Sequence, residues 1–265
     1  MVDEWISFTT DYGLADGFVA ACHGVAARLA PAVRIIDVTH LVPPGDVRRG
    51  ATVLSQTVAD LPRAVHLAVV DPGVGTARRP IGLLTAAGSF LVGPDNGLLV
   101  PAADELGGIT AAVTLGNAGW HAARVSPTFH GRDVFMPVAA RLATGADLTD
   151  AGPALDPASL VRLDPLELRR SGDRLLSGVR GVDRFGNLQL AARGDVPVAP
   201  VLTVDGQRAR RVRTFGDVPV GELAVLVDSA GYLAVAVNGG SAAGRLGVAA
   251  GETVELAPAA TDDPH

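Results

Sequence analysis

The first half of the chain alternates short apolar runs with stretches of helical periodicity, and this alternation limits the possible folds more than any other feature. The expected strands cover residues 5–9, 33–38, 65–70, 81–84, 90–92 and 111–115, and the expected helices cover residues 16–29, 46–61, 98–106 and 133–143. Asp46 is a suitable N-cap for the second helix. Strands that alternate with helices form a mostly parallel sheet with flanking helices, so the pattern indicates a Rossmann-like α/β domain.

The second half has a different character. From residue 178 onward, strand-like runs follow one another with turn residues between them and almost no helical periodicity. These runs cover residues 188–191, 201–204, 210–214, 223–227, 233–237 and 252–256. Short strands separated by turns predict a small all-β barrel. We therefore expect an α/β domain at residues 1–165, a β-barrel domain at residues 166–258 and a loose polar tail at residues 259–265.

The composition excludes several classes of chemistry. All 22 basic residues are arginine, so there is no lysine for a Schiff base or for a GxxxxGK[ST] phosphate loop. Cys22 is the only cysteine, which excludes an intramolecular disulfide, an iron–sulfur cluster and a cysteine-rich zinc site. A net charge of −6 and 4% aromatic residues argue against a nucleic-acid surface. No apolar run is long enough to span a membrane, so we expect a soluble cytoplasmic protein.

Polar residues directly after predicted strands are the first candidates for a site, because ligands of open α/β sheets bind beyond the carboxyl ends of strands. Asp11 follows the first strand and Asp71 follows the third. Either aspartate can hold a ligand, and either can instead cap a helix or close an Asx turn. His130 precedes a predicted helix, where it is a general base, a hydrogen-bond donor or an ordinary polar residue at a helix start.

Other site signatures are weak or absent. Gly73 and Gly75 form a G-x-G pair without the third glycine of a dinucleotide fingerprint. The chain has no GxSxG elbow for a serine nucleophile, and its histidines do not have the HExxH spacing of a zinc site. A site rich in aspartate, arginine and histidine, without a nucleophilic side chain, favours direct attack by water or a small ion.

Six short strings occur in the order seen in one family: FTTDYG at 8–13, DVTH at 37–40, DPGVG at 71–75, GPDNG at 93–97, FHGRD at 129–133 and DRFGN at 183–187. The chain resembles the S-adenosylmethionine hydroxide adenosyltransferases, also called adenosine-forming S-adenosylmethionine hydrolases, which are related to fluorinases and chlorinases. The resemblance extends from about residue 5 to residue 256. It implies an α/β domain followed by a barrel, and a homotrimer whose sites lie between the first domain of one subunit and the barrel of its neighbour. Because the residues show no metal-ligand spacing and no complete dinucleotide fingerprint, we expect no metal and no cofactor.

The resemblance also assigns site residues. It implies a catalytic set of Asp71, Arg78 and His130. In the mechanism expected for this set, Arg78 lies near the attacking oxygen and favours hydroxide, while Asp71 and His130 orient the oxygen and relay its proton. For the substrate, it implies that Asp11 holds the ribose hydroxyls. The remaining substrate contacts that it implies are Asp183, Asn187 and Ser229 for the methionine part, and backbone groups near Asn238 and Gly239 for adenine. Ala230 stands where the halogenases carry an arginine, so the contact to the methionine carboxylate differs here.

These residues lead to one expected reaction and three competing hypotheses. Water or hydroxide attacks the ribose C5′ atom of S-adenosylmethionine, and neutral methionine leaves, so the products are adenosine and methionine. The first competing hypothesis, a halide-using synthase of 5′-halo-5′-deoxyadenosine, is disfavoured because the Asp71 carboxylate would repel an anion. The second is a non-catalytic sensor of adenosine or S-adenosylmethionine, and the third is a metal-dependent hydrolase.

Overall fold

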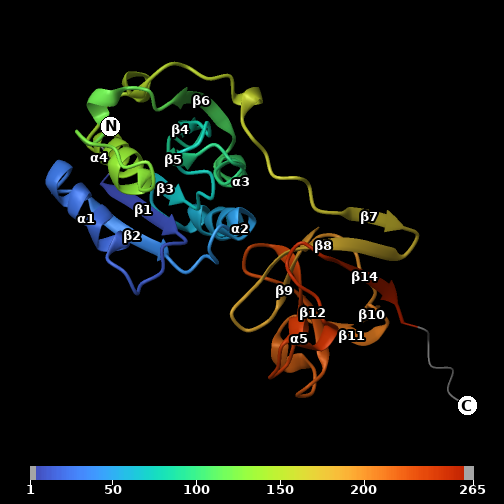
Figure 1. Ribbon diagram of the computed structural model, residues 1–265. Coiled ribbons are helices and arrows are strands. Elements are labelled where there is room, and N and C mark those ends of the chain that lie inside the picture. Colours follow the sequence, from blue (N-terminus) through green and yellow to red (C-terminus); the bar gives the residue numbers. More distant parts are fainter. Residues whose placement is uncertain (1–3, 260–265) are drawn as a thin grey trace, which may run out of the picture. The chain divides into compact units, whose positions relative to one another are not determined.

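The computed structural model describes residues 4–259, and the chain divides between Leu163 and Asp164 into two compact units (Figure 1). Of the predicted tail, only Ala259 belongs to the described residues. The elements of the first unit are β1 (Trp5–Thr10), α1 (Phe18–Leu29), β2 (Arg34–Thr39), α2 (Val47–Thr57), β3 (Val65–Val69), β4 (Pro80–Thr85), β5 (Phe90–Pro94), α3 (Val100–Glu105), β6 (Ile109–Thr114) and α4 (Met136–Ala143). Those of the second unit are β7 (Leu168–Ser171), β8 (Arg174–Val182), β9 (Leu188–Arg193), β10 (Val201–Val204), β11 (Gln207–Arg211), β12 (Leu223–Val227), β13 (Tyr232–Val237), α5 (Ala242–Leu246) and β14 (Thr253–Pro258).

The first unit is built on a six-stranded sheet with the order β2-β1-β3-β5-β4-β6. The pairs β2–β1, β1–β3 and β3–β5 are parallel, whereas β4 runs antiparallel to both of its neighbours. The predicted α/β domain with a mostly parallel sheet is therefore confirmed. In this topology the carboxyl ends of β1 and β3 lie side by side at one edge of the sheet.

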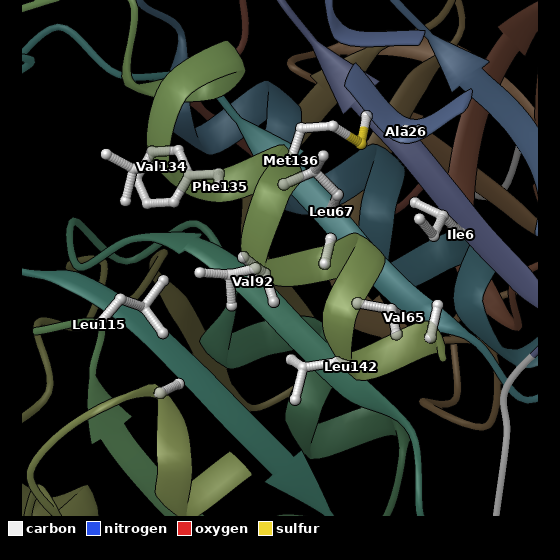
Figure 2. Close-up of a cluster of buried hydrophobic side chains, with 14 of the residues drawn as sticks. Ile6, Ala26, Val65, Leu67, Val92, Leu115, Val134, Phe135, Met136 and Leu142 are labelled. Atoms are coloured by element: carbon white, nitrogen blue, oxygen red, sulfur yellow. The ribbon is translucent and has the colours of Figure 1, made fainter. Parts of the chain in front are cut away.

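Helices cover both faces of the sheet, and the side chains of the central strand β3 pack against helices on both sides. Every residue of β3 is buried, as expected for a central parallel strand. Val65 and Leu67 belong to one apolar cluster with residues of α1 and α4, part of which Figure 2 shows. Ala68 and Val70 belong to a second cluster with residues of α2 and α3. Successive residues of β3 thus point to opposite faces, and each face has its own core.

The helices of the first unit are short, and two of them differ from the prediction. Asp46 caps α2 as predicted, with its side chain accepting from the Arg49 N–H at 2.8 Å. The helix ends at Thr57 and continues only as a 3₁₀ turn. The last predicted helix begins with a π-helical turn at Gly131–Phe135, and α4 follows it. Among residues 4–259, no helix is long and apolar enough to cross a lipid bilayer.

The second unit contains a closed barrel of seven strands. Its strand order is β14-β10-β11-β12-β13-β9-β8, and the pairing of β14 with β8 closes it, while β7 adds to β8 outside the ring. The predicted barrel is confirmed. The strands β7 and β8 were not among the predicted strands, and α5 is a helix where none was predicted. The strand predicted at residues 210–214 was wrong in position. Asp205 and Gly206 have positive φ angles of 47° and 77° and close a two-residue hairpin, so pairing starts at Gln207.

Candidate active site

Two carboxylates meet at the carboxyl edge of the sheet. Thr10 at the end of β1 pairs with Val69 at the end of β3, so Asp11 and Asp71 leave the sheet at the same edge. Both line one cavity of about 230 Å³. The other residues that line it are Tyr12, Gly45, Val69, Pro72, Val74, Thr128, Phe129, His130 and Gly131. The sheet topology therefore brings the two predicted aspartates and His130 to one cavity.

The loop after β3 folds back on itself and presents Arg78 to Asp71. The Thr76 hydroxyl donates to the Gly73 carbonyl at 2.7 Å, and Thr76 Oγ1 accepts from the Arg78 N–H at 3.3 Å. Gly75 has a φ of +77°, and a Cβ there would lie 2.5 Å from the Pro127 carbonyl oxygen. Gly75 therefore serves a tight turn packed on the chain, which removes the dinucleotide-binding interpretation of the G-x-G pair.

Arg78 joins Asp71 to His130. Its Nε donates to Asp71 Oδ1 at 3.1 Å, and its Nη2 donates to Asp71 Oδ2 and lies 3.2 Å from His130 Nδ1. The side chains of Arg78 and Asp71 are only 7% and 5% exposed, and the guanidinium lies 5.2 Å from the centre of the Phe135 ring. Arg78 does not itself line the cavity, but Asp71 and His130, which it contacts, both do. A bidentate buried pair of this kind fixes the orientation of both partners.

These contacts determine the protonation states. An arginine can only donate, so His130 Nδ1 accepts, and the imidazole is neutral with its proton on Nε2. Burial and the nearby Arg78 charge both lower the pKa of His130, in agreement with this tautomer. Burial raises the pKa of Asp71, and the charge and hydrogen bonds of Arg78 oppose that shift. The cavity thus holds a carboxylate that binds protons more readily than an ordinary aspartate, beside a neutral imidazole that donates.

Asp11 is neither a helix cap nor part of an Asx turn, and its ligand-binding role stays a prediction. Its Oδ2 accepts from the Gly45 N–H at 2.8 Å, which closes a turn in the loop before α2. Its Oδ1 has no hydrogen-bond partner within residues 4–259, and the side chain lines the cavity. One oxygen therefore supports the loop, and the other is available to a ligand.

Tyr12 and Gly131 couple the two loops that form the cavity. A Cβ on Gly131 would lie 1.9 Å from the Tyr12 hydroxyl, so the close approach of these loops requires glycine. The Tyr12 ring also makes edge contacts with Phe8 and Phe129, at centroid distances of 6.4 and 5.7 Å. Desolvation raises the pKa of Tyr12 well above its ordinary value, so the phenol stays protonated.

In the second unit, Asp183 and Asn187 form one turn between β8 and β9. Asp183 Oδ1 accepts from the backbone N–H groups of Phe185 and Asn187 at 2.8 and 2.9 Å, and Oδ2 accepts from Asn187 Nδ2 at 2.8 Å. Three of the roughly four acceptor positions of a carboxylate are thus used inside the turn. Asp183 shapes this turn and orients the Asn187 amide.

A second cavity, of about 520 Å³, lies beside this turn. Its lining residues are Phe185, Asn187, Phe215, Val237, Gly239, Gly240 and Ser241. Phe185 and Phe215 are 76% and 49% exposed, which is unusual for such large apolar side chains. Asn238 lies next to this lining, and its side-chain amide donates to the Val218 carbonyl at 2.7 Å. The barrel thus offers an aromatic and glycine-rich surface suited to a flat ring.

The structure does not bring Ser229 to this group. Ser229 lies in the turn between β12 and β13, whereas Asn187, Asn238 and Gly239 lie near the opposite end of β13. The six residues of β13 separate the two ends by roughly 20 Å at 3.3 Å per residue. Within one chain, β13 therefore separates Ser229 from Asn187 and Asn238, and the contact of Ser229 to methionine stays a prediction.

Several site residues had no clear signal in the sequence. Tyr12 and Phe185 lie within recognised motifs, but nothing local indicates that one lines a cavity and the other is exposed. Phe215 and Ser241 lie outside every motif. The one sequence signal for Phe185 and Phe215 is that each precedes a glycine in a turn. A large apolar side chain in a turn is often exposed, and exposed aromatic side chains often bind ligands.

An α/β domain with an Asp–Arg–His set at the carboxyl edge of its sheet, followed by a closed barrel, defines a class of two-domain enzymes. Two family models match the chain: SAM hydroxide adenosyltransferase N-terminal domain over residues 6–152, and SAM hydroxide adenosyltransferase C-terminal domain over residues 178–255. The chain belongs to the SAM hydroxide adenosyltransferase family, where SAM is S-adenosylmethionine.

Individual relatives agree with this assignment. A protein of Salinispora tropica named (R)-S-adenosyl-L-methionine hydrolase is 64% identical over 254 residues, which cover 95% of this chain and 97% of that protein. A protein of an Actinoplanes species named fluorinase is 31% identical over 295 residues, covering 96% and 97% of the two chains. A crystal structure of a conserved Thermotoga maritima protein has a TM-score of 0.88 at 37% identity, covering 95% of this chain and 99% of that one.

Proposed function

We propose that the protein hydrolyses S-adenosyl-L-methionine to adenosine and L-methionine, with water or hydroxide attacking the ribose C5′ atom. The observation that carries this proposal is a carboxylate with a raised pKa next to a neutral histidine in one cavity, both held by Arg78. The 64% identity with a protein named (R)-S-adenosyl-L-methionine hydrolase supports the same reaction.

In this mechanism Asp71 accepts the proton of the attacking water, and the Nε2–H of His130 orients its oxygen. The new C5′–O bond forms as the C5′–S bond breaks, and the bonding electrons return to sulfur, which becomes a neutral thioether. The leaving group needs no acid, because the sulfonium loses its charge in this step. Alignment of the nucleophile contributes on the order of 7–11 kcal/mol. Arg78 acts as a positioning residue that holds Asp71 and His130.

The charge of the cavity favours water over halide. Asp11 and Asp71 line it, no arginine does, and His130 is neutral. The Asp11 carboxylate attracts the sulfonium of the substrate and repels an anionic nucleophile, whereas Arg78 offsets the charge of Asp71. A like charge about 4 Å from a carboxylate without a paired cation, such as Asp11, costs about 4 kcal/mol at an effective dielectric constant of 20. A fluorinase-type reaction is therefore disfavoured at this site.

Binding of the substrate is divided between groups already described. We assign the ribose hydroxyls to the free oxygen of Asp11. We assign the adenine ring to the exposed faces of Phe185 and Phe215, where base–aromatic stacking contributes about 1–3 kcal/mol. Asn187 and the backbone near Asn238 and Gly239 supply the polar contacts.

Incubation with S-adenosylmethionine in oxygen-18 water without halide tests the reaction directly. Mass analysis of the nucleoside should show adenosine with the label on its 5′ oxygen. A 5′-halonucleoside that forms on addition of chloride would instead identify a halogenase. Detectable binding without any nucleoside product would identify a sensor.

The resemblance to the family supports a homotrimer in which the α/β domain of one subunit and the barrel of the next share each site. Asp71→Asn and Asn187→Ala place one defect in each domain. If sites are shared, coexpression of the two inactive variants restores about a quarter of the sites by random assembly. If each site belongs to one chain, the mixed protein stays inactive.

We further propose that the enzyme acts in the cytoplasm. The presence of a single cysteine is in keeping with a reducing compartment. Fractionation of the native cells, followed by assay of each fraction for adenosine formation, tests this location.

A further inference from the structure

Three side chains with metal-binding atoms converge outside the cavity. They are His23 on α1, Asp37 on β2 and His40 directly after β2, and one donor atom from each lies within 4.8 Å of the others. His23 Nε2 is 2.9 Å from Asp37 Oδ1, and His40 Nε2 is 3.1 Å from the same oxygen. None of the three lines the cavity that contains Asp71. Spacing along the chain hides this group, because His23 is 14 residues from Asp37 and on another element.

The buried member of the group is incompletely satisfied. The His40 side chain is 3% exposed, and its Nδ1 lies 2.8 Å from Thr10 Oγ1. Its Nε2 is buried, faces Asp37 and His23, and has no hydrogen-bond partner within residues 4–259. The ring nitrogen is close to the carboxylate but is not directed at its oxygen. A buried polar atom without a hydrogen-bond partner costs free energy of folding, and an ion bound between these side chains would satisfy it.

We propose that His23, Asp37 and His40 bind a divalent transition-metal ion of the Zn²⁺ type. Two imidazole nitrogens and one carboxylate oxygen are ligands of this ion, and water supplies the fourth. Ligand atoms of a tetrahedral zinc site lie roughly 3.3 Å apart at bond lengths of 2.0–2.1 Å. The two histidine nitrogens lie 2.9 and 3.1 Å from Asp37 Oδ1, and all three ligand atoms lie within 4.8 Å of one another. Thr10 holds the His40 ring through Nδ1, which leaves the Nε2 lone pair for the metal.

The proposed ion would link two elements next to the candidate active site. It ties α1 to the end of β2 and holds His40, whose carbonyl oxygen accepts from the Gly13 N–H at 2.7 Å. The segment between Thr10 and Gly13 carries Asp11 and Tyr12 into the candidate active site. The ion therefore braces this segment from outside the cavity, with water in its open fourth position. The partial exposure of His23 and Asp37, 35% and 42%, provides a path for the ion.

The test is calorimetric titration of ZnCl₂ into the full-length protein after treatment with a chelator. The wild type should bind one ion per chain, and the thermal unfolding temperature should rise with it. The His23→Gln variant, altered at a half-exposed side chain, should lose at least tenfold in affinity and should show no thermal shift. Thr10→Val should weaken binding by about 10–100-fold through the orientation of His40.

His130→Gln is the matched control, because it removes a histidine from the other candidate site. It should bind zinc like the wild type. X-ray absorption at the zinc edge should show two imidazole ligands in both proteins. The proposal is overturned if the wild type shows no saturable binding, if His23→Gln binds with unchanged affinity, or if His130→Gln loses the ion.

Discussion

Replacement of Asp71 by asparagine separates the catalytic from the structural role of the buried pair. The amide keeps the size of the side chain and one acceptor for Arg78, but it cannot take a proton from water. Loss of one acid–base group costs about 10²–10⁴-fold in kcat. The Arg78 side chain, 7% exposed, also loses its charged partner, so unfolding should become easier by up to about 3–5 kcal/mol. We expect kcat to fall by about 10²–10⁴-fold, with little change in KM.

The assay is adenosine release followed by chromatography across the acid range of pH. The active form of Asp71 is deprotonated, and burial raises its pKa, so kcat/KM of the wild type should fall with acid at a pH above that expected for an ordinary aspartate near 3.9. The asparagine variant should lack this acid limb.

Asp95→Asn is the matched control for stability. Asp95 is 2% exposed and forms an equally close pair with Arg79, whose Nε donates to Asp95 Oδ2 at 2.8 Å, but it does not line the cavity. Because the Arg79 side chain is 34% exposed, this variant should lose no more stability than Asp71→Asn, while kcat stays within a few-fold of the wild type. Equal losses of kcat in both variants would refute a catalytic role of Asp71.

Three further changes test other parts of the structure. Asp11→Asn should raise KM by about 10–100-fold with little effect on kcat, because a hydrogen bond to a charged group contributes about 1.5–3 kcal/mol; steady-state kinetics that show a loss in kcat alone would contradict this. Gly131→Ala should lower the free energy of unfolding by about 1–3 kcal/mol, since the new Cβ meets the Tyr12 hydroxyl, and Tyr12→Phe in that background should recover part of the loss in denaturant titrations. Burial lowers the pKa of His66 to about 4, so the unfolded chain binds the proton first, and stability should decrease by up to about 3 kcal/mol as pH falls from 6.5 to 4; the pH profile of His66→Leu should be flatter over this window.

The sequence by itself determined the classes of structure in the two halves, because strand and helix periodicity are local properties of the chain. The strands at Val201–Val204 and Leu223–Val227 were predicted to the residue, since each is a short apolar run bounded by polar or turn residues. The helix cap at Asp46 was predicted for the same reason. Absence of lysine and of a second cysteine excluded whole classes of chemistry without reference to any fold.

Tertiary structure alone decided which residues meet. Arg78 and His130 are 52 positions apart, and they come together because the loops after β3 and before α4 fold over the same edge of the sheet. The length of β13 likewise separates Ser229 from Asn187 and Asn238 within one chain, and the packing of α1 brings His23 to Asp37. A sequence motif records which side chains are present, but their distances and pKa values depend on burial and on neighbours distant in the chain. The distances and the pKa values are therefore determined only in the folded sheet and the closed barrel.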